Sequence, residues 1–289
     1  MPRMREPTRP WYDTPSVRRV LVIAALLGIG LGVQTVVLHA TMDPLADLHA
    51  YVDAASRLNA GLPLYGQPAG TDDAAFYRYP PLLAVVFRPI AALPFEVVAV
   101  IWEAILVMAL LLTIVRLGAM RPATWVLIGM LALPIAWSFV IGQAHILVTL
   151  LLAVGAPWSV ALAAHLKLFP ALAAIWWIGR RDWASLARFA GWLSAFTLLQ
   201  LVVEPAGSLA YPAFIASDQI GAVNSISPFA VSPVLWVVIV AGLAVSALRF
   251  ARSPLGWPLA IALAVFAAPR LLVYQLATLV AGLRAPDDR

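Results

Sequence analysis

Three charged residues stand beside or inside apolar stretches, where charge has either a chemical use or a cost. Asp47 follows the first apolar segment, and Lys167, the only lysine among 19 basic residues, lies within a later one. Arg270 interrupts a third apolar stretch. A carboxylate after a membrane segment can act as a general base. A cation in hydrocarbon costs about 2.5–3.5 kcal/mol, so it normally faces a cavity or a partner, and both cation types bind phosphate. These residues predict a base beside a phosphate site.

Each of these residues also has a purely structural interpretation. Asp47 can be a solvated loop acid, and Arg270 can be a helix-end arginine at a membrane interface. Lys167 can extend to an interface or pair with Glu103, which lies within an apolar segment of its own. Gly142-Gln143 is either a helix break or a sugar contact. Residue type and position alone leave these alternatives open.

The sequence offers no sign of a metal or a cofactor. It contains no cysteine, and its four histidines, which include His145 and His165, show no metal-ligand spacing. No dinucleotide, Walker or HExxH motif is present. We therefore expect neither a metal nor a cofactor, and any chemistry must rest on isolated polar groups.

The composition places these residues in a membrane protein. Apolar residues make up 63% of the 289 residues, charged residues only 11%, and the mean hydropathy is +0.91. A soluble domain of this size has no core large enough for so much apolar surface. Continuous apolar stretches exclude a transmembrane β-barrel, and the composition excludes a disordered chain or a DNA-binding domain. The net charge of +5 is explained by arginines beside membrane helices, so we expect no nucleic acid partner.

The predicted fold is all-α: a polytopic membrane protein with about nine transmembrane or half-spanning helices. Residues 1–19 are predicted to form a cytoplasmic tail, residues 20–283 a single transmembrane domain and residues 284–289 a polar tail. Residues 41–78 form the first outer loop, with a short helix at 44–59. The apolar segments lie at 20–40, 80–93, 96–115, 122–142, 143–155, 157–178, 184–203, 230–248 and 255–282.

Charge sets the predicted orientation. Arginines cluster at 3–19, 180–188 and 249–252, while 41–78 holds five acidic residues and 204–228 has no lysine or arginine. The positive-inside rule places the clusters and the N-terminus in the cytoplasm and the two loops outside a plasma membrane. One point stays open: segments 80–93 and 143–155 either cross fully or dip from the outer face as half-helices.

A series of short motifs runs in order along most of residues 17–280. They read Asp47-Leu-His-Ala-Tyr51-Val-Asp53-Ala54-Ala55, Gly61-Leu-Pro63-Leu-Tyr65, Tyr79-Pro80-Pro81-Leu82, Leu93-Pro94-Phe95, Gly142-Gln143, Leu166-Lys167-Leu-Phe169-Pro170 with Arg180-Arg181-x-Trp183, and Pro269-x-x-x-x-Tyr274. This order resembles the GT-C glycosyltransferases, and within them the actinobacterial polyprenol-phosphate-mannose-dependent α-mannosyltransferases.

The resemblance implies a GT-C-like fold, a reaction and a set of site residues. A polyprenyl-phosphate sugar, with mannose expected, would bind at the outer face, and the sugar would pass with inversion to a lipid or glycan acceptor. Asp47 matches the family's catalytic aspartate, so the resemblance makes it the base that takes the acceptor proton. Lys167, Arg270, Gln143, Tyr79 and Tyr274 are the implied substrate-binding residues.

Two other functions remain compatible with the sequence. One is a lipid or ion transporter whose pathway is lined by Glu103, Lys167 and Arg270. The other is a non-catalytic subunit of an envelope-assembly complex. The acidic outer loop with its Tyr79-Pro80-Pro81 entry favours the enzyme, and no internal repeat supports the paired halves of many transporters. An enzyme requires Asp47, Lys167 and Arg270 around one cavity.

Overall fold

The computed structural model describes residues 14–42, 44–66, 76–220 and 225–286. Within these ranges the regular structure is entirely helical, which confirms the predicted all-α class. Asp43, Asp72 and Asp73 of the predicted outer loop lie outside the described residues, as do 1–13 of the N-terminal tail and 287–289 of the C-terminal one.

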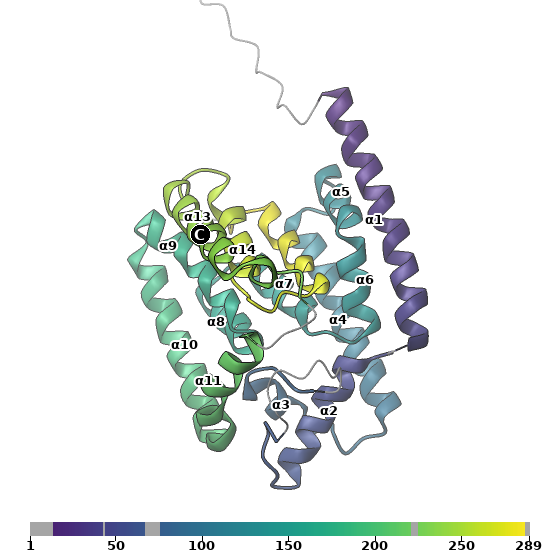
Figure 1. Cartoon of the computed structure of the whole chain (residues 1–289), viewed down its shortest axis with the longest axis vertical. Helices are drawn as coiled ribbons and strands as arrows, with labels where there is room; N and C mark the ends of the chain where they lie inside the picture. The colour runs from purple at the N-terminus through teal and green to yellow at the C-terminus, as the bar shows by residue number, and fades with distance from the viewer. Residues whose placement is uncertain (1–13, 43, 67–75, 221–224, 287–289) are drawn as a thin grey trace, which may run out of the picture.

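Two long helices flank the molecule. α1 (Pro15–Met42) and α10 (Trp183–Val203) run along opposite sides, and α2 (Ala46–Asn59) and α3 (Pro81–Phe87) close one end between them (Figure 1). We call this the α2 end. The remaining elements are α4 (Phe95–Leu117), α5 (Pro122–Met130), α6 (Ala132–Val140), α7 (His145–Val154), α8 (Pro157–Leu166), η2 (Phe169–Ala174), α9 (Ile175–Arg180), α11 (Pro205–Ile220), α12 (Pro228–Val231), α13 (Pro233–Arg249), α14 (Gly256–Phe266) and η3 (Val273–Leu283).

The helix starts follow from local sequence. α3, α5, α8 and α13 each begin with a proline, whose missing N–H is no loss in a first turn. Asp182 caps α10, because its carboxylate accepts a bond of 3.0 Å from the Ser185 N–H. The predicted helix of the outer loop is confirmed as α2, which ends just before the positive-φ residue Gly61.

The basic turns gather opposite the α2 end. Arg284 donates to the carbonyl of Arg116, and Arg180 lies over the ring of Trp176, whose indole N–H donates to the carbonyl of Ala251. A surface pocket lined by Arg116, Trp176 and Arg188, among others, joins these turns. We call this the arginine-rich end. Since α1 also starts at this end (Figure 1), the basic turns share one side of the molecule.

Two helical hairpins extend from the arginine-rich end toward the α2 end. The lysine hairpin (residues 157–180) runs toward the α2 end along α8, turns at Lys167 and returns through η2 and α9. The arginine hairpin (residues 256–283) runs toward the α2 end along α14, turns at 267–272 around Arg270 and returns as η3. Trp257 in α14 donates to the carbonyl of Ala281, which ties the base of the second hairpin together. Each hairpin thus carries one cation at its tip.

The predicted helix count is not confirmed. Three helices in the described ranges are long and apolar enough to cross a bilayer, namely α1, α4 and α10. The bent pair α5 and α6, with an angle of 64° between its halves, makes a possible fourth. The segment 255–282 is a hairpin instead of the expected single span. Pro269 lacks the N–H that would continue the helix, and the polar Arg270 is placed in the turn.

Segments 80–93 and 143–155, which the sequence left as either full spans or half-helices, behave differently from each other. Segment 80–93 stays at the α2 end, because Arg88 hydrogen-bonds Asn59 at the end of α2 and the Phe95 ring stacks on His49. Segment 143–155 does not return to that end. It begins beside α2, where a Cβ on Gly142 would meet Leu48, and finishes at Gly155, where a Cβ would meet Pro286. All the turns that carry arginine clusters can therefore share one side.

Candidate active site

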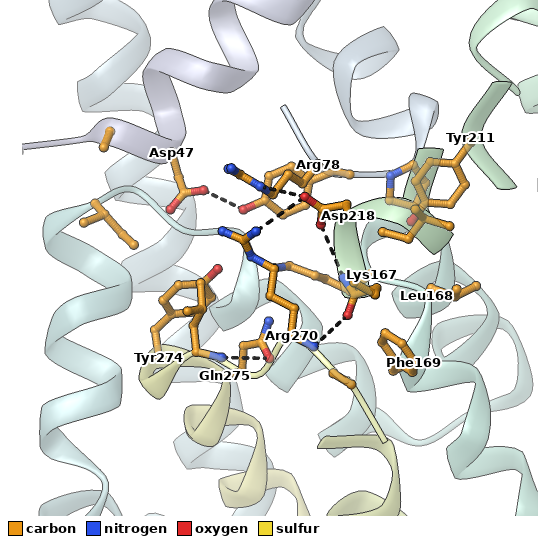
Figure 2. Close-up of a pocket in the computed structure, with 18 of the residues that line it drawn as sticks. Asp47, Arg78, Lys167, Leu168, Phe169, Tyr211, Asp218, Arg270, Tyr274 and Gln275 are labelled. Atoms are coloured by element: carbon orange, nitrogen blue, oxygen red, sulfur yellow. Dashed lines mark hydrogen bonds and ion pairs between the residues drawn. The ribbon is translucent and has the colours of Figure 1, made fainter. Parts of the chain in front are cut away.

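A cavity of about 280 Å³ lies beneath α2, between the tips of the two hairpins (Figure 2). Its walls come from the start of α2, residues 78–80, α6, α11 and both tips. Its floor and sides mix charged groups with tyrosine and apolar side chains. The residues that the rest of this section uses are Asp47, Arg78, Tyr79, Lys167, Tyr211, Asp218, Gln219, Arg270 and Tyr274.

Asp47 reaches the cavity because α2 starts against the turn that follows α6. The N–H groups of Leu45 and Asp47 donate to the carbonyls of Val140 and Ile141, at 2.8 and 2.9 Å. At Gly142 the backbone has φ +69°, and a Cβ there would stand 2.9 Å from that of Leu48. Only glycine fits both the conformation and the contact. This close docking fixes the position of Asp47 at the edge of the cavity.

The Asp47 carboxylate is held on one side and open on the other. Tyr79 donates a hydrogen bond of 2.5 Å to Asp47 Oδ1. Burial raises the pKa of Asp47 above its ordinary value, and the Tyr79 bond together with the positive charges of Lys167 and Arg78 opposes that rise. A carboxylate with a raised pKa is a stronger base than one in water. Its free edge lines the cavity and is open to a ligand there.

Lys167 stands at the tip of the lysine hairpin. α8 ends there because the backbone of Lys167 is extended, at φ −150° and ψ 131°. Its ammonium lies 4.5 Å from the ring centre of Tyr79 and 5.3 Å from that of Tyr274. Cation–π contacts of this kind hold an ammonium without neutralising it. The two rings therefore place the ammonium group of Lys167 at the wall of the cavity.

Arg270 and Arg78 flank a shared carboxylate. Asp218, on α11, is fully buried and lies 3.1 Å from Arg78 Nε and 3.5 Å from Arg270 Nη1. The neighbouring Gln219 accepts a bond of 3.1 Å from the backbone N–H of Arg270. Asp218 therefore fixes two guanidinium groups at one wall of the cavity (Figure 2).

The structure brings together most of the residues singled out in the sequence. Asp47, Tyr79, Lys167, Arg270 and Tyr274 all line the cavity. Gln143 lies behind it, fully buried and bonded to Tyr79 and Tyr51, and is not among the lining residues. Glu103, the expected structural partner of a cation, makes no ion pair within the described residues, and its Oε1 is buried without a hydrogen bond there.

The sequence did not point to Arg78, Asp218 or Gln219. Asp218 lies in a segment expected to be an outer loop, but that segment is the helix α11. The only signal was its position as an acid in a stretch without lysine or arginine. Its pairing with Arg78 joins positions 140 residues apart, which no local pattern reports.

The other candidates do not form a metal centre. His165 bonds the carbonyl of Ala161 and the hydroxyl of Thr197, and His145 packs against the Tyr274 ring. Within the ranges that the structure describes, no group of three His, Asp or Glu side chains is placed to hold a metal ion.

Comparison with known families decides the class of the protein. The model of glycosyltransferase family 87 matches residues 76–283. The chain belongs to this family. The match covers both hairpin tips, α11 and Tyr79, and it confirms the predicted resemblance to the polyprenol-phosphate-mannose-dependent mannosyltransferases. Asp47 and α2 precede the matched range.

Two curated relatives of this family-87 chain carry the same name. Polyprenol-phosphate-mannose-dependent alpha-(1-2)-phosphatidylinositol pentamannoside mannosyltransferase of Mycolicibacterium smegmatis is 35% identical over 49% of the chain and 39% of its own length. Its namesake in Mycobacterium tuberculosis is 30% identical over 56% of the chain and 43% of its own length. The chain thus matches about two fifths of each relative. No solved structure matches significantly.

Proposed function

We propose that the protein is an inverting membrane mannosyltransferase that uses a polyprenyl-phosphate-mannose donor and a lipid or glycan acceptor. One observation carries the proposal: Asp47, Lys167 and Arg270, far apart in the sequence, line a single cavity. Family membership supports the reaction class, and the names of the two relatives support the donor and suggest a phosphatidylinositol mannoside as acceptor.

The charge of the cavity suits the donor and its product. Three cations (Arg78, Lys167 and Arg270) and two carboxylates (Asp47 and Asp218) line it, so its formal charge is +1. A polyprenyl phosphodiester carries one negative charge. The phosphate monoester released after transfer carries about −1.5 to −2. When Asp47 accepts a proton, the lining becomes +2, so protein charge and phosphate charge rise together.

The transfer follows from these positions. The acceptor hydroxyl loses its proton to the free edge of Asp47 as its oxygen bonds the anomeric carbon of mannose. The bond from that carbon to the phosphate oxygen breaks, and its electron pair leaves with the phosphate. Lys167 and Arg270 stabilise the negative charge that develops there, in a site partly closed to water. Attack opposite the leaving group inverts the anomeric centre.

The proposed orientation places the site at the outer face of the plasma membrane. The arginine-rich end then faces the cytoplasm together with the N-terminus, in agreement with the positive-inside rule. The α2 end, with exposed Asp53 and the cavity beneath α2, faces outward. Leu168 at the tip of the lysine hairpin is 44% exposed beside the cavity and offers an apolar exit for the polyprenyl chain.

The transporter alternative fits the described structure less well. A pathway must reach both faces, but η2 of the lysine hairpin packs against α14 of the arginine hairpin, and the buried Ala173, Ala260 and Ile261 belong to one apolar core. In the described ranges this apolar packing joins the two hairpins whose tips carry the cations of the cavity.

The direct test is product formation. Membranes from a host that expresses the protein, and matched membranes without it, are given polyprenyl-phosphate-[¹⁴C]mannose and phosphatidylinositol mannosides, and the lipids are separated. The proposal expects a new labelled lipid only with the protein, at unchanged rate in the presence of a chelator. Equal label in both membrane preparations, with the protein shown to be folded, would overturn it.

A further inference from the structure

A chain of hydrogen bonds enters Asp47 from behind the cavity. The Ala144 N–H donates to the Tyr51 hydroxyl at 3.2 Å, and Tyr51 donates to Gln143 Oε1 at 2.9 Å. Gln143 Nε2 donates to the Tyr79 hydroxyl at 2.8 Å, and Tyr79 donates to Asp47 Oδ1 at 2.5 Å. Tyr51, Gln143 and Tyr79 are all buried. The chain joins the start of α7 to the carboxylate, and of its side chains only Tyr79 reaches the cavity lining.

The direction of each bond in this chain follows from the donors and acceptors that are available. A backbone N–H cannot accept, so the bond from Ala144 fills a lone pair of the Tyr51 hydroxyl and leaves its single hydrogen for Gln143. The Gln143 amide must then present its oxygen to Tyr51, which turns its N–H₂ group toward Tyr79. The Tyr79 hydroxyl has two acceptors within reach, Gln143 Oε1 at 3.1 Å and Asp47 Oδ1 at 2.5 Å. Its single hydrogen goes to the shorter bond with the charged carboxylate, because charge-assisted bonds are the stronger ones. The amide orientation of one glutamine therefore determines what Asp47 receives.

We propose that Tyr51 and Gln143 are positioning residues which, through Tyr79, keep the Asp47 carboxylate ionised and leave its second oxygen for the acceptor. The inference rests on the proposed function, since it assigns the tuning of the base in that reaction. It gives Gln143 a role behind the cavity, in place of the substrate contact that the family resemblance implies. It also explains why Tyr51, with no access to the cavity, is bonded at its hydroxyl.

The surroundings of Asp47 make such a device necessary. Burial raises the pKa of Asp47, and the same burial keeps Tyr79 and Tyr51 protonated by raising their pKa values. The other ionisable groups that face Asp47 are Arg78 from the segment before α3, Lys167 from the lysine hairpin and Tyr274 from η3. Donation from Tyr79 and the two cations favours the carboxylate against its burial.

The test is the pH dependence of transfer in Tyr51→Phe and Gln143→Leu. Loss of the hydrogen bonds that orient Tyr79 lets its hydroxyl turn away from Asp47, so the pKa of Asp47 rises. The acid limb of the kcat/KM profile should move up by about one pH unit, the size expected for one hydrogen bond to a charged group. Activity should return at high pH. Tyr79→Phe, which removes the final bond itself, should move the limb at least as far.

Tyr77→Phe is the matched control. The Tyr77 hydroxyl also accepts from a backbone N–H, that of Ala84 at 2.9 Å, and lies in the same aromatic cluster as Tyr51. It donates instead to the Pro80 carbonyl at 2.7 Å, away from Asp47. Tyr77→Phe should therefore lower stability as Tyr51→Phe does and leave the acid limb in place. The proposal would be overturned if the acid limb of Tyr51→Phe stayed at the wild-type pH. It would also be overturned if Tyr77→Phe moved the acid limb as far as Tyr51→Phe does.

A second readout separates this inference from the proposed function. The carbonyl stretch of protonated Asp47, assigned by its loss in Asp47→Asn, is titrated by infrared difference spectroscopy in the wild type and in Tyr51→Phe. The proposal expects the midpoint to rise in Tyr51→Phe whether or not the protein transfers mannose. An unchanged midpoint would refute the role of the hydrogen-bond chain and leave the proposed function intact. Undiminished transfer by Asp47→Asn would refute Asp47 as the base.

Discussion

Lys167 offers the sharpest perturbation, because the chain uses arginine at its other 18 basic positions. Its ammonium occupies a narrow place between two rings, 4.5 Å from that of Tyr79 and 5.3 Å from that of Tyr274. A compact ammonium fits there, while a planar guanidinium needs a wider, flat space. Lys167→Arg therefore keeps the charge and changes its shape, and Lys167→Met removes the charge with little change in length.

The expected losses follow from the distance and the medium. A unit charge about 4 Å from a phosphate is worth about 4 kcal/mol at an effective dielectric of 20. Arg78 and Arg270 remain in the variant and compensate in part. Removal of one preorganised group from a developing oxyanion typically costs about 10²–10³-fold. We expect a loss of this order in kcat/KM for Lys167→Met and at least about tenfold for Lys167→Arg.

The assay is donor-dependent transfer by protein in nanodiscs, with donor and acceptor varied in turn. Both Lys167 variants should weaken the binding of the donor more than that of the acceptor, since Lys167 is assigned to the donor phosphate. Arg180→Lys is the matched control. Arg180 also lies over an aromatic ring, that of Trp176 at 4.7 Å, but at the arginine-rich end. It should leave transfer unchanged. Turnover near wild type in Lys167→Arg would return Lys167 to a structural role and leave Arg270 as the phosphate ligand.

Three further predictions test orientation, electrostatics and backbone fit. A cysteine at Ser208 should react with an impermeant thiol reagent in intact cells, and one at the exposed Arg252 only after lysis; the reverse pattern would invert the topology. Asp218→Asn leaves two cations facing each other, so it should cost about 3 kcal/mol or more in a thermal unfolding assay and slow transfer; unchanged stability would contradict the shared ion pair. Gly142→Ala should nearly abolish transfer, because its Cβ pushes α2 and Asp47 away. Gly61→Ala is the control: it has a similar φ of +71° but open space around it, so it should only lose about 1–2 kcal/mol of stability. Equal transfer activities in the two variants would refute the docking of α2 against Gly142.

The sequence was most informative where a single segment carries its own signal. The long apolar runs gave α1, α4 and α10, and Gly61-Leu-Pro63 marked the end of α2. The unusual lysine and the isolated Arg270 were each expected to face a cavity, and both line the one beside α2. In each case the signal is the cost of a charge in an apolar stretch, which acts locally and needs no knowledge of the partner.

Contacts across the fold were not accessible in the same way. The hairpin at 256–283 reads as one apolar span because hydropathy does not register a reversal of direction, and only Pro269 hinted at the turn. Asp218 could not be matched to Arg78, since the helix α11 that positions it was expected to be a loop. Gln143 was noticed as a break between helices, but its bonds to Tyr51 and Tyr79 depend on how α2 docks against Gly142.

The central claim is that Asp47 is the base of mannosyl transfer in this cavity. Its most direct test is a single turnover of polyprenyl-phosphate-[¹⁴C]mannose by purified wild type, Asp47→Asn and Asp53→Asn in nanodiscs. Asp53 lies on the same helix, exposed and away from the cavity, so it is the matched control. A positioned base contributes about 10²–10⁴-fold. Our account predicts a loss of this size in Asp47→Asn with bound donor retained and near wild-type transfer in Asp53→Asn, and it is contradicted if Asp47→Asn transfers mannose at the wild-type rate.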